Sequence, residues 1–206
     1  LKEMDFKMNK LLKKMMVALL SLGLVQAVWA DAVPDFQETL QAAKQGYAAA
    51  QYNLGLMYNQ GQGVRQDYTQ AVQWYRKAAE QGDAKAQYNL GVMYAKGRGV
   101  RQDDAEAVRW YRQAAAQGLV QAQYNLGGMY ADGQGVRQDY AQAVQWYRQA
   151  AAQGLVQAQY NLGVMYYNGQ GARQNHKIAK EWFGKACDNG YQQGCDNYRK
   201  LNQAGY

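Results

Sequence analysis

The side chains that most often carry out covalent chemistry are nearly absent from this chain. After Ser21 the sequence contains no serine, its threonines are Thr39 and Thr69, and His176 is its single histidine. A serine–histidine triad or a histidine-rich metal site therefore has too few residues. We expect no catalytic residue, no cofactor and no metal, and we expect His176 to lie on the surface near the start of a helix.

The two cysteines, Cys187 and Cys195, allow two interpretations. A Cys187 thiol paired with His176 would be a nucleophile. In an oxidising compartment, an isolated close pair is better explained as one disulfide. We expect the Cys187–Cys195 bridge, and closing so short a loop stabilises by roughly 2–3 kcal/mol in the chain-entropy model.

The first 30 residues have the pattern of a secretory signal peptide. Lys10, Lys13 and Lys14 precede the apolar run 15–25, and small residues precede a cut after Ala30. We expect residues 1–30 to be cleaved, translation to start at Met8, and the protein to be periplasmic or secreted without stable membrane insertion. A retained membrane anchor is the alternative.

Export lowers the net charge of the protein. Residues 1–30 hold five of the 23 basic and two of the 16 acidic residues, so 18 basic and 14 acidic residues remain and +7 becomes +4. So mild an excess does not indicate a nucleic-acid-binding surface, and we expect no nucleic-acid partner.

The helices that must position these side chains recur along the chain. The motif Ala-Gln-Tyr-Asn-Leu-Gly-x-Met-Tyr occurs four times at a spacing of 36 residues, at 50–58, 86–94, 122–130 and 158–166. A fixed period of this size predicts a stacked repeat array. Its Ala, Leu, Gly and Tyr share one face of a first helix, and a glycine inside that helix indicates close packing.

A second helix follows each copy after a Gly-x-Gly loop. Asp103 with Glu106, like Asp67 and Asp139 with the Gln three residues later, predicts a capping box. The apolar stripe Ala-x-x-Trp-Tyr-x-x-Ala-Ala then forms a wide face. Glycines in left-handed conformation are expected to end these helices, at Gly82, Gly118, Gly154 and Gly190.

These motifs resemble the Sel-1-like (SLR) repeat, a relative of the tetratricopeptide (TPR) repeat, from about Asp35 to Leu201. The resemblance implies an all-α, right-handed α-solenoid of antiparallel helix pairs that serves as a protein-binding scaffold. The expected organisation is a signal peptide at 1–30, an N-terminal capping helix at 31–46, four repeats at 47–190 and a C-terminal capping helix at 191–206.

The last unit departs from the other copies, as a terminal repeat must when it has no neighbour to cover it. Ala172, Asn175 and Phe183 replace repeated residues, and His176, Ile178 and Lys180 break the pattern. The position of the cysteine pair is similar to that in the cysteine-rich secreted (Hcp-like) branch of the family, but here only the final unit has it.

Three further rows of residues have alternative interpretations. We interpret the Gly-x-Gly loops as helix caps with a turn, because none continues into a phosphate-binding motif. The arginine row would attract an acidic partner, or it forms a stripe that is solvated or paired with aspartates; its members are Arg65, Arg101, Arg137 and Arg173. The Trp74, Trp110, Trp146 and Trp182 row is expected to pack in the core, and an aromatic platform for sugars or bases is the alternative.

A ligand-binding stripe is predicted on the first helices, because positions that contact a partner can vary between copies. The predicted groove has a shared tyrosine floor with varying neighbours, or these tyrosines only pack between helices. Its residues are Tyr52, Tyr88, Tyr124, Tyr160, Leu56, Val92, Val164, Lys85, Gln121, Gln157 and Tyr167.

The favoured function is an exported, non-enzymatic scaffold or adaptor that holds an envelope or host protein, or a peptide, in this groove. The alternative, attributed to the cysteine-rich branch, is a cell-wall or β-lactam-directed binding protein or a weak β-lactamase-like hydrolase. The missing Ser-x-x-Lys motif opposes it. Glycan or peptidoglycan binding without catalysis remains open.

Overall fold

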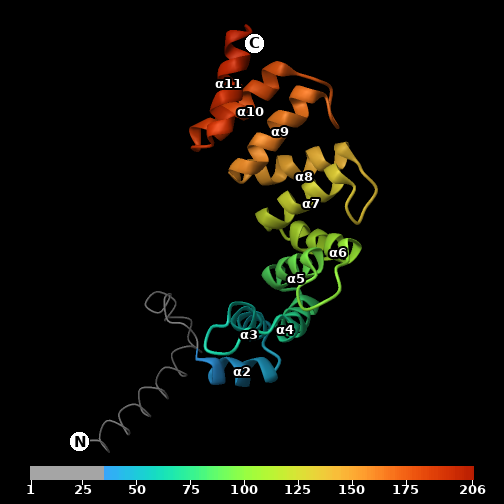
Figure 1. Cartoon of the computed structure of the whole chain (residues 1–206), viewed down its shortest axis with the longest axis vertical. Coiled ribbons are helices and arrows are strands. Elements are labelled where there is room, and N and C mark those ends of the chain that lie inside the picture. Colours follow the sequence, from blue (N-terminus) through green and yellow to red (C-terminus); the bar gives the residue numbers. More distant parts are fainter. Residues whose placement is uncertain (1–34) are drawn as a thin grey trace, which may run out of the picture. The chain divides into compact units, whose positions relative to one another are not determined.

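The computed structural model describes residues 35–206, so the expected signal peptide at 1–30 lies outside the described residues. Within that range the chain forms ten α-helices and no strand (Figure 1). They are α2 (Phe36–Lys44), α3 (Ala48–Gln60), α4 (Tyr68–Glu80), α5 (Ala84–Lys96), α6 (Asp104–Ala116), α7 (Val120–Asp132), α8 (Tyr140–Ala152), α9 (Val156–Asn168), α10 (His176–Asp188) and α11 (Gln192–Gln203). None of these is long and apolar enough to cross a membrane.

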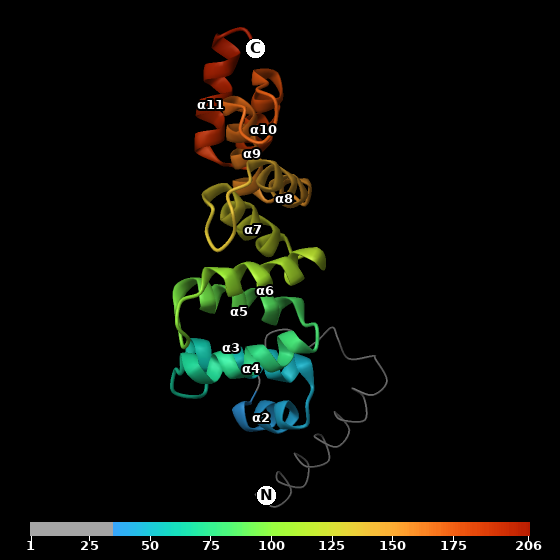
Figure 2. The ribbon, with the colours of Figure 1, turned by 90° about the vertical axis from the view of Figure 1, so that its right-hand side faces the viewer.

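The helices from α2 to α11 are stacked in chain order (Figures 1 and 2). The closest packing is within the pairs α3–α4, α5–α6, α7–α8 and α9–α10, and each pair then packs on the next. This arrangement confirms the predicted α-solenoid of helix pairs. In every pair we call the earlier member the first helix and the later member the second helix.

The hydrophobic core consists of separate cells that each lie across a repeat boundary. One cell combines Ala78 of α4, Leu90 of α5 and Trp110 of α6. Trp74, Trp146 and Trp182 take the same part in neighbouring cells. The tryptophans therefore pack in the core, as predicted. Each one packs its own pair against the helix that precedes that pair.

The glycine inside each first helix permits a ring to contact the backbone. A Cβ atom on Gly91 would lie 2.8 Å from the ring of Tyr111, and one on Gly127 would lie 2.7 Å from Tyr147. Gly55 meets Tyr75 and Gly163 meets Phe183 in the same way. The predicted packing reason for this glycine is thus the aromatic residue of the second helix in the same pair.

The Gly-x-Gly loops contain two glycines with different roles. Gly97 has φ +61° and caps α5, as predicted for a helix cap. Gly99 has φ +70°, and a Cβ there would lie 2.2 Å from the carbonyl oxygen of Tyr68, the first residue of the preceding second helix. The second glycine therefore allows the loops at Gly99, Gly135 and Gly171 to lie against the backbone of the previous repeat.

The predicted capping box is only half formed. The Asp103 carboxylate accepts from the backbone N–H of Glu106 at 3.0 Å, as expected. The Asp103 N–H, however, donates to the carbonyl of Tyr94 at 3.1 Å, and the Glu106 carboxylate pairs with Arg109 instead. The Tyr94 carbonyl of the first helix thus accepts the Asp103 N–H, in place of the Glu106 carboxylate that a complete capping box would use.

A buried glutamine links each first helix to the second helix before it. Gln87 is 4% exposed, donates to the Ala79 carbonyl at 3.1 Å and accepts from Gln117 at 2.8 Å. Gln117 also donates to the Gly82 carbonyl at 3.0 Å. Gln51, Gln123 and Gln159 repeat the bond to the preceding helix, so a polar ladder runs along the stack.

Replacing Gly99 with Ala should destabilise the stack more than replacing Gly118. Both glycines have positive φ, at +70° and +86°, but a Cβ on Gly118 meets nothing within 4 Å. Both variants carry the strain of a left-handed alanine, and only Gly99→Ala adds a backbone clash, worth roughly 1–3 kcal/mol more. Urea unfolding followed by circular dichroism measures the difference. Equal losses would show that the close approach does not matter.

Replacing Gln123 with Leu should lower the free energy of unfolding by roughly 1 kcal/mol, because it removes the side-chain hydrogen bond that joins α7 to the preceding helix. Gln123 contacts the Ala115 carbonyl and the side chains of Gln149 and Gln153. Gln121→Leu, two residues earlier on the exposed side of α7, is the control and should change stability little. Thermal unfolding of the two variants tests the ladder, and similar behaviour would contradict it.

Candidate functional site

Three adjoining clefts are formed by helices α5 to α11. The central cleft, about 490 Å³, includes Tyr111, Tyr124, Asn125 and Tyr147. The bridging cleft, about 350 Å³, shares Asp132, Tyr147 and Asn161 with it. The terminal pocket, about 460 Å³, shares Val164 with the bridging cleft and adds residues of α10 and α11. Because neighbouring clefts share walls, they form a continuous series.

The structure brings three of the predicted groove residues to these clefts. Tyr124 lines the central cleft, Val164 lines the bridging cleft and the terminal pocket, and Tyr167 lines the terminal pocket. The other predicted residues lie outside these three clefts. Lys85, Gln121 and Gln157 are exposed in the first turns of their helices, and the remainder are half-buried: Tyr52, Leu56, Tyr88, Val92 and Tyr160.

The tyrosine row of the first helices also has a packing role. Tyr88 lies 5.8 Å from Tyr111 and Tyr124 lies 5.7 Å from Tyr147, measured between ring centroids. Tyr52 and Tyr160 contact Tyr75 and Phe183 in the same way. Tyr124 therefore packs within its pair and lines a cleft, so packing and ligand contact are compatible at this position.

An asparagine row was missed by the sequence reasoning. Asn125 and Asn161 line the central cleft, and Asn197 lines the terminal pocket. With Asn53 and Asn89 they recur every 36 residues, even though α11 has lost most of the motif. The sequence did contain a signal for this row, because one position inside every first helix is always asparagine.

The tyrosines of the second helices are held in their neutral form. Burial raises the pKa of Tyr111 and of Tyr147 to about 12. Hydrogen bonding by Asn125 and Asn161 opposes the rise in these pKa values, while the neighbouring Tyr88 and Tyr124 add to it. Both phenols therefore stay protonated throughout the physiological pH range.

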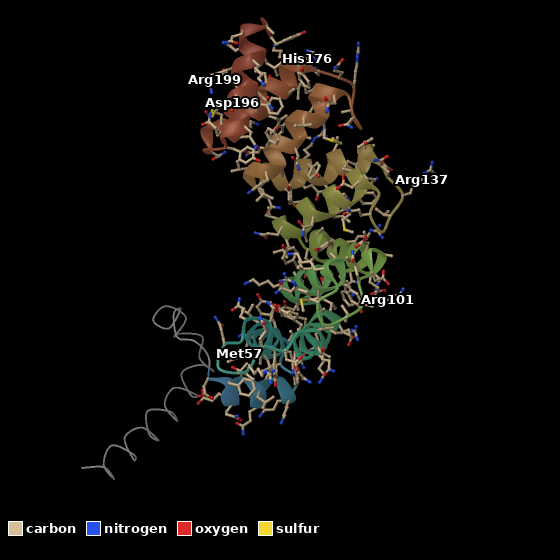
Figure 3. All side chains as sticks on the ribbon, in the orientation of Figure 1. Met57, Arg101, Arg137, His176, Asp196 and Arg199 are labelled. Atoms are coloured by element: carbon tan, nitrogen blue, oxygen red, sulfur yellow. A yellow bond between two sulfur atoms is a disulfide. The ribbon has the colours of Figure 1, made fainter. Side chains whose placement is uncertain are left out.

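His176 lies at the surface but is half-buried, because it lines a pocket there. It is the first residue of α10, as predicted, but its ring lies 5.0 Å from Tyr167 and 4.6 Å from Tyr206 and lines the terminal pocket. Figure 3 shows His176 in this last part of the stack. Its position in a pocket follows from packing against Tyr167 of α9 and Tyr206 beyond α11, which its neighbours in sequence do not reveal.

The predicted disulfide between Cys187 and Cys195 is confirmed, with Cα atoms 4.5 Å apart. The alternative of a Cys187–His176 pair is wrong. Cys187 is bonded to Cys195, and 11 residues of α10 separate it from His176, roughly 16 Å along the helix axis. Within residues 35–206, no group of three or more His, Cys, Asp or Glu side chains is placed to hold a metal ion.

The arginines of the loops remain exposed to solvent. Arg101 and Arg137 project from successive loops (Figure 3). Neither forms an ion pair within the described part of the chain. The structure thus favours the solvated stripe over an Asp-paired one for these two residues.

The sequence profile of the Sel1 repeat matches residues 48–83, 84–119, 120–155 and 156–191. The chain belongs to the Sel1-repeat family. No curated protein sequence matches it. The Sel1 boundaries coincide with the helix pairs α3–α4 to α9–α10, so each pair with its following turn is one repeat.

Solved Sel1-repeat structures have the same fold. One is a protective antigen present in uropathogenic Escherichia coli strains, which displays an SLR fold. It is 43% identical to this chain with a TM-score of 0.80, and the match covers 84% of this chain and 37% of the antigen. A Sel1 repeat protein from Oxalobacter formigenes is 37% identical with a TM-score of 0.71, over 82% and 67%. Helicobacter pylori cysteine rich protein B is 27% identical with a TM-score of 0.50, over 66% and 98%. The chain thus spans about a third of the Escherichia coli protein.

The free energy of unfolding should fall between about pH 10 and pH 12, where buried tyrosines begin to ionise. The folded state holds the pKa of Tyr111 and Tyr147 at about 12, whereas an unfolded tyrosine ionises near pH 10. The stabilisation is therefore complete below pH 10 and is lost as the pH rises, by roughly 1 kcal/mol per group at pH 11. Urea unfolding across this range should show a shallower fall for Tyr111→Phe. An unchanged slope would contradict the assignment.

Proposed function

We propose that this protein is an exported, non-enzymatic scaffold that binds an extended segment of a protein or peptide along the three clefts. Proteins of Sel1 repeats generally mediate protein–protein interactions, and that role extends to this chain as a member of the family. The observation that carries the proposal is the continuity of the clefts across the successive repeats from α5 to α11.

The chemistry of the cleft walls supports a peptide ligand. Tyrosine offers a large rigid apolar face with a polar tip, and such residues are enriched in protein interfaces. Tyr124 supplies such a face in the central cleft, and Tyr167 supplies one in the terminal pocket. The asparagine amides between them can both donate and accept hydrogen bonds.

The Cys187–Cys195 disulfide supports an oxidising compartment such as the periplasm or the exterior of the cell. The solved relative that is an antigen of a pathogenic Escherichia coli is in keeping with such a location. The partner would therefore be an envelope protein or, if the protein leaves the cell, a host protein.

Photo-cross-linking from chosen positions tests this function. A benzophenone amino acid is placed at Tyr124 or Tyr167 in the clefts, or at Tyr47 as the control. Tyr47 is an exposed tyrosine outside them, 63% exposed against 44% for Tyr167. After irradiation with envelope extract or host-cell lysate, we expect one and the same protein, identified by mass spectrometry, from both cleft positions and not from Tyr47. Adducts that form equally from Tyr47 would contradict binding in the clefts.

A further inference from the structure

The two ends of the cleft series carry opposite charge. Asp104 and Asp132 line the central cleft, whose walls include no lysine, arginine or histidine. Neither carboxylate forms an ion pair within residues 35–206. The terminal pocket has the reverse character, because Lys200 lines it and no aspartate or glutamate side chain does. The cleft series is thus acidic at its central cleft and basic at its terminal pocket.

The carboxylates of the central cleft share its walls with tyrosine rings. The charge of Asp104 acts on Tyr111 and that of Asp132 acts on Tyr147, in each case raising the pKa of the phenol. A lysine or arginine side chain in this cleft would meet two carboxylates and the aromatic faces around them, and both interactions favour a cation. Because the cleft is open, an ion pair between a ligand cation and Asp104 or Asp132 stays partly solvated. The carboxylates and rings together therefore provide selectivity for a basic side chain.

The terminal pocket gathers the residues by which the last repeat differs from the others. Tyr167 stands where the other repeats have Asn or Ala. His176 stands where they have Tyr or Asp, and Phe183 where they have Tyr. With Leu201 these rings form the apolar part of the wall. Lys200 occupies the position of Val164 one period later. The pocket therefore combines an apolar space with a cation.

A row of amides connects the two ends. Asn125 and Asn161 lie in the central cleft, and Asn197 lies in the terminal pocket. Each side-chain amide matches the donor and acceptor of a peptide group, so an extended main chain can bond to successive repeats. Such bonds are independent of sequence, which leaves selectivity to the charged ends.

From these observations we propose that the ligand is an extended peptide with a defined charge order. A lysine or arginine binds at Asp104 and Asp132 in the central cleft. Further along the segment, an apolar or aromatic side chain enters the terminal pocket next to an acidic group that pairs with Lys200. This inference rests on the proposed function and adds the chemistry of the partner.

Selection from a library of randomised peptides displayed on phage tests the charge order. The baits are the full chain, the variant Asp104→Asn/Asp132→Lys and the variant Lys200→Glu. Matched controls outside the clefts are Asp188→Asn/Glu80→Lys and Lys44→Glu, whose mutated side chains are exposed helix-end residues. Circular dichroism verifies that each variant is folded.

The unmodified chain and both controls should enrich peptides with a basic residue separated from an aromatic–acidic pair. The central-cleft variant should lose the basic preference and the Lys200 variant the acidic one, each with about tenfold weaker binding of the original peptides. Enriched peptides without a charge order, or an order that the cleft variants leave unchanged, would overturn the inference and leave peptide binding intact. A failure to enrich any peptide would overturn the proposed function as well.

Discussion

The buried glutamine of each first helix is the contact on which the stack depends. A second helix ends with carbonyls that have no partner inside the helix, and here that end is covered by the next repeat. Gln87 adds a second hydrogen bond to the Ala79 carbonyl, which also accepts from the Gly82 N–H, and Gln117 donates to both Gln87 and the Gly82 carbonyl. Because both glutamines donate to carbonyls of the preceding repeat, each repeat is bonded to its neighbour, as the nearest-neighbour cooperativity of a solenoid requires.

The contact between a glycine and an aromatic ring connects this stacking to the clefts. Without a side chain at Gly127, the ring of Tyr147 lies directly on the backbone of α7, and Tyr124 packs on that ring from the same helix. Both tyrosines also line the central cleft. The cleft floor is therefore made of rings that the fold already immobilises, so a ligand that binds them loses little side-chain entropy.

The sequence was sufficient for the fold and only partly sufficient for the site. A period of 36 residues, a glycine in each first helix and a capping aspartate or asparagine before each second helix predict helix pairs in a stack, and that prediction is confirmed. Residue spacing did not reveal that Gly99 approaches Tyr68, because that contact joins two repeats. The asparagine row was missed because residues repeated in every copy were assigned to packing. The terminal pocket could not be read from spacing, because it combines residues from three helices, α9 to α11.

The last repeat shows how an end unit replaces the links that its predecessors make. Arg148 of α8 donates to Tyr166 of α9 at 2.6 Å, but the corresponding position of α10 is Gly184, against which Tyr198 packs. The Cys187–Cys195 bridge and the bond from Lys180 to Asn202 now join α10 to α11. With no further repeat to position α11, these links hold Asn197, Lys200 and Leu201 opposite Phe183. The terminal pocket therefore depends on the same residues that close the stack.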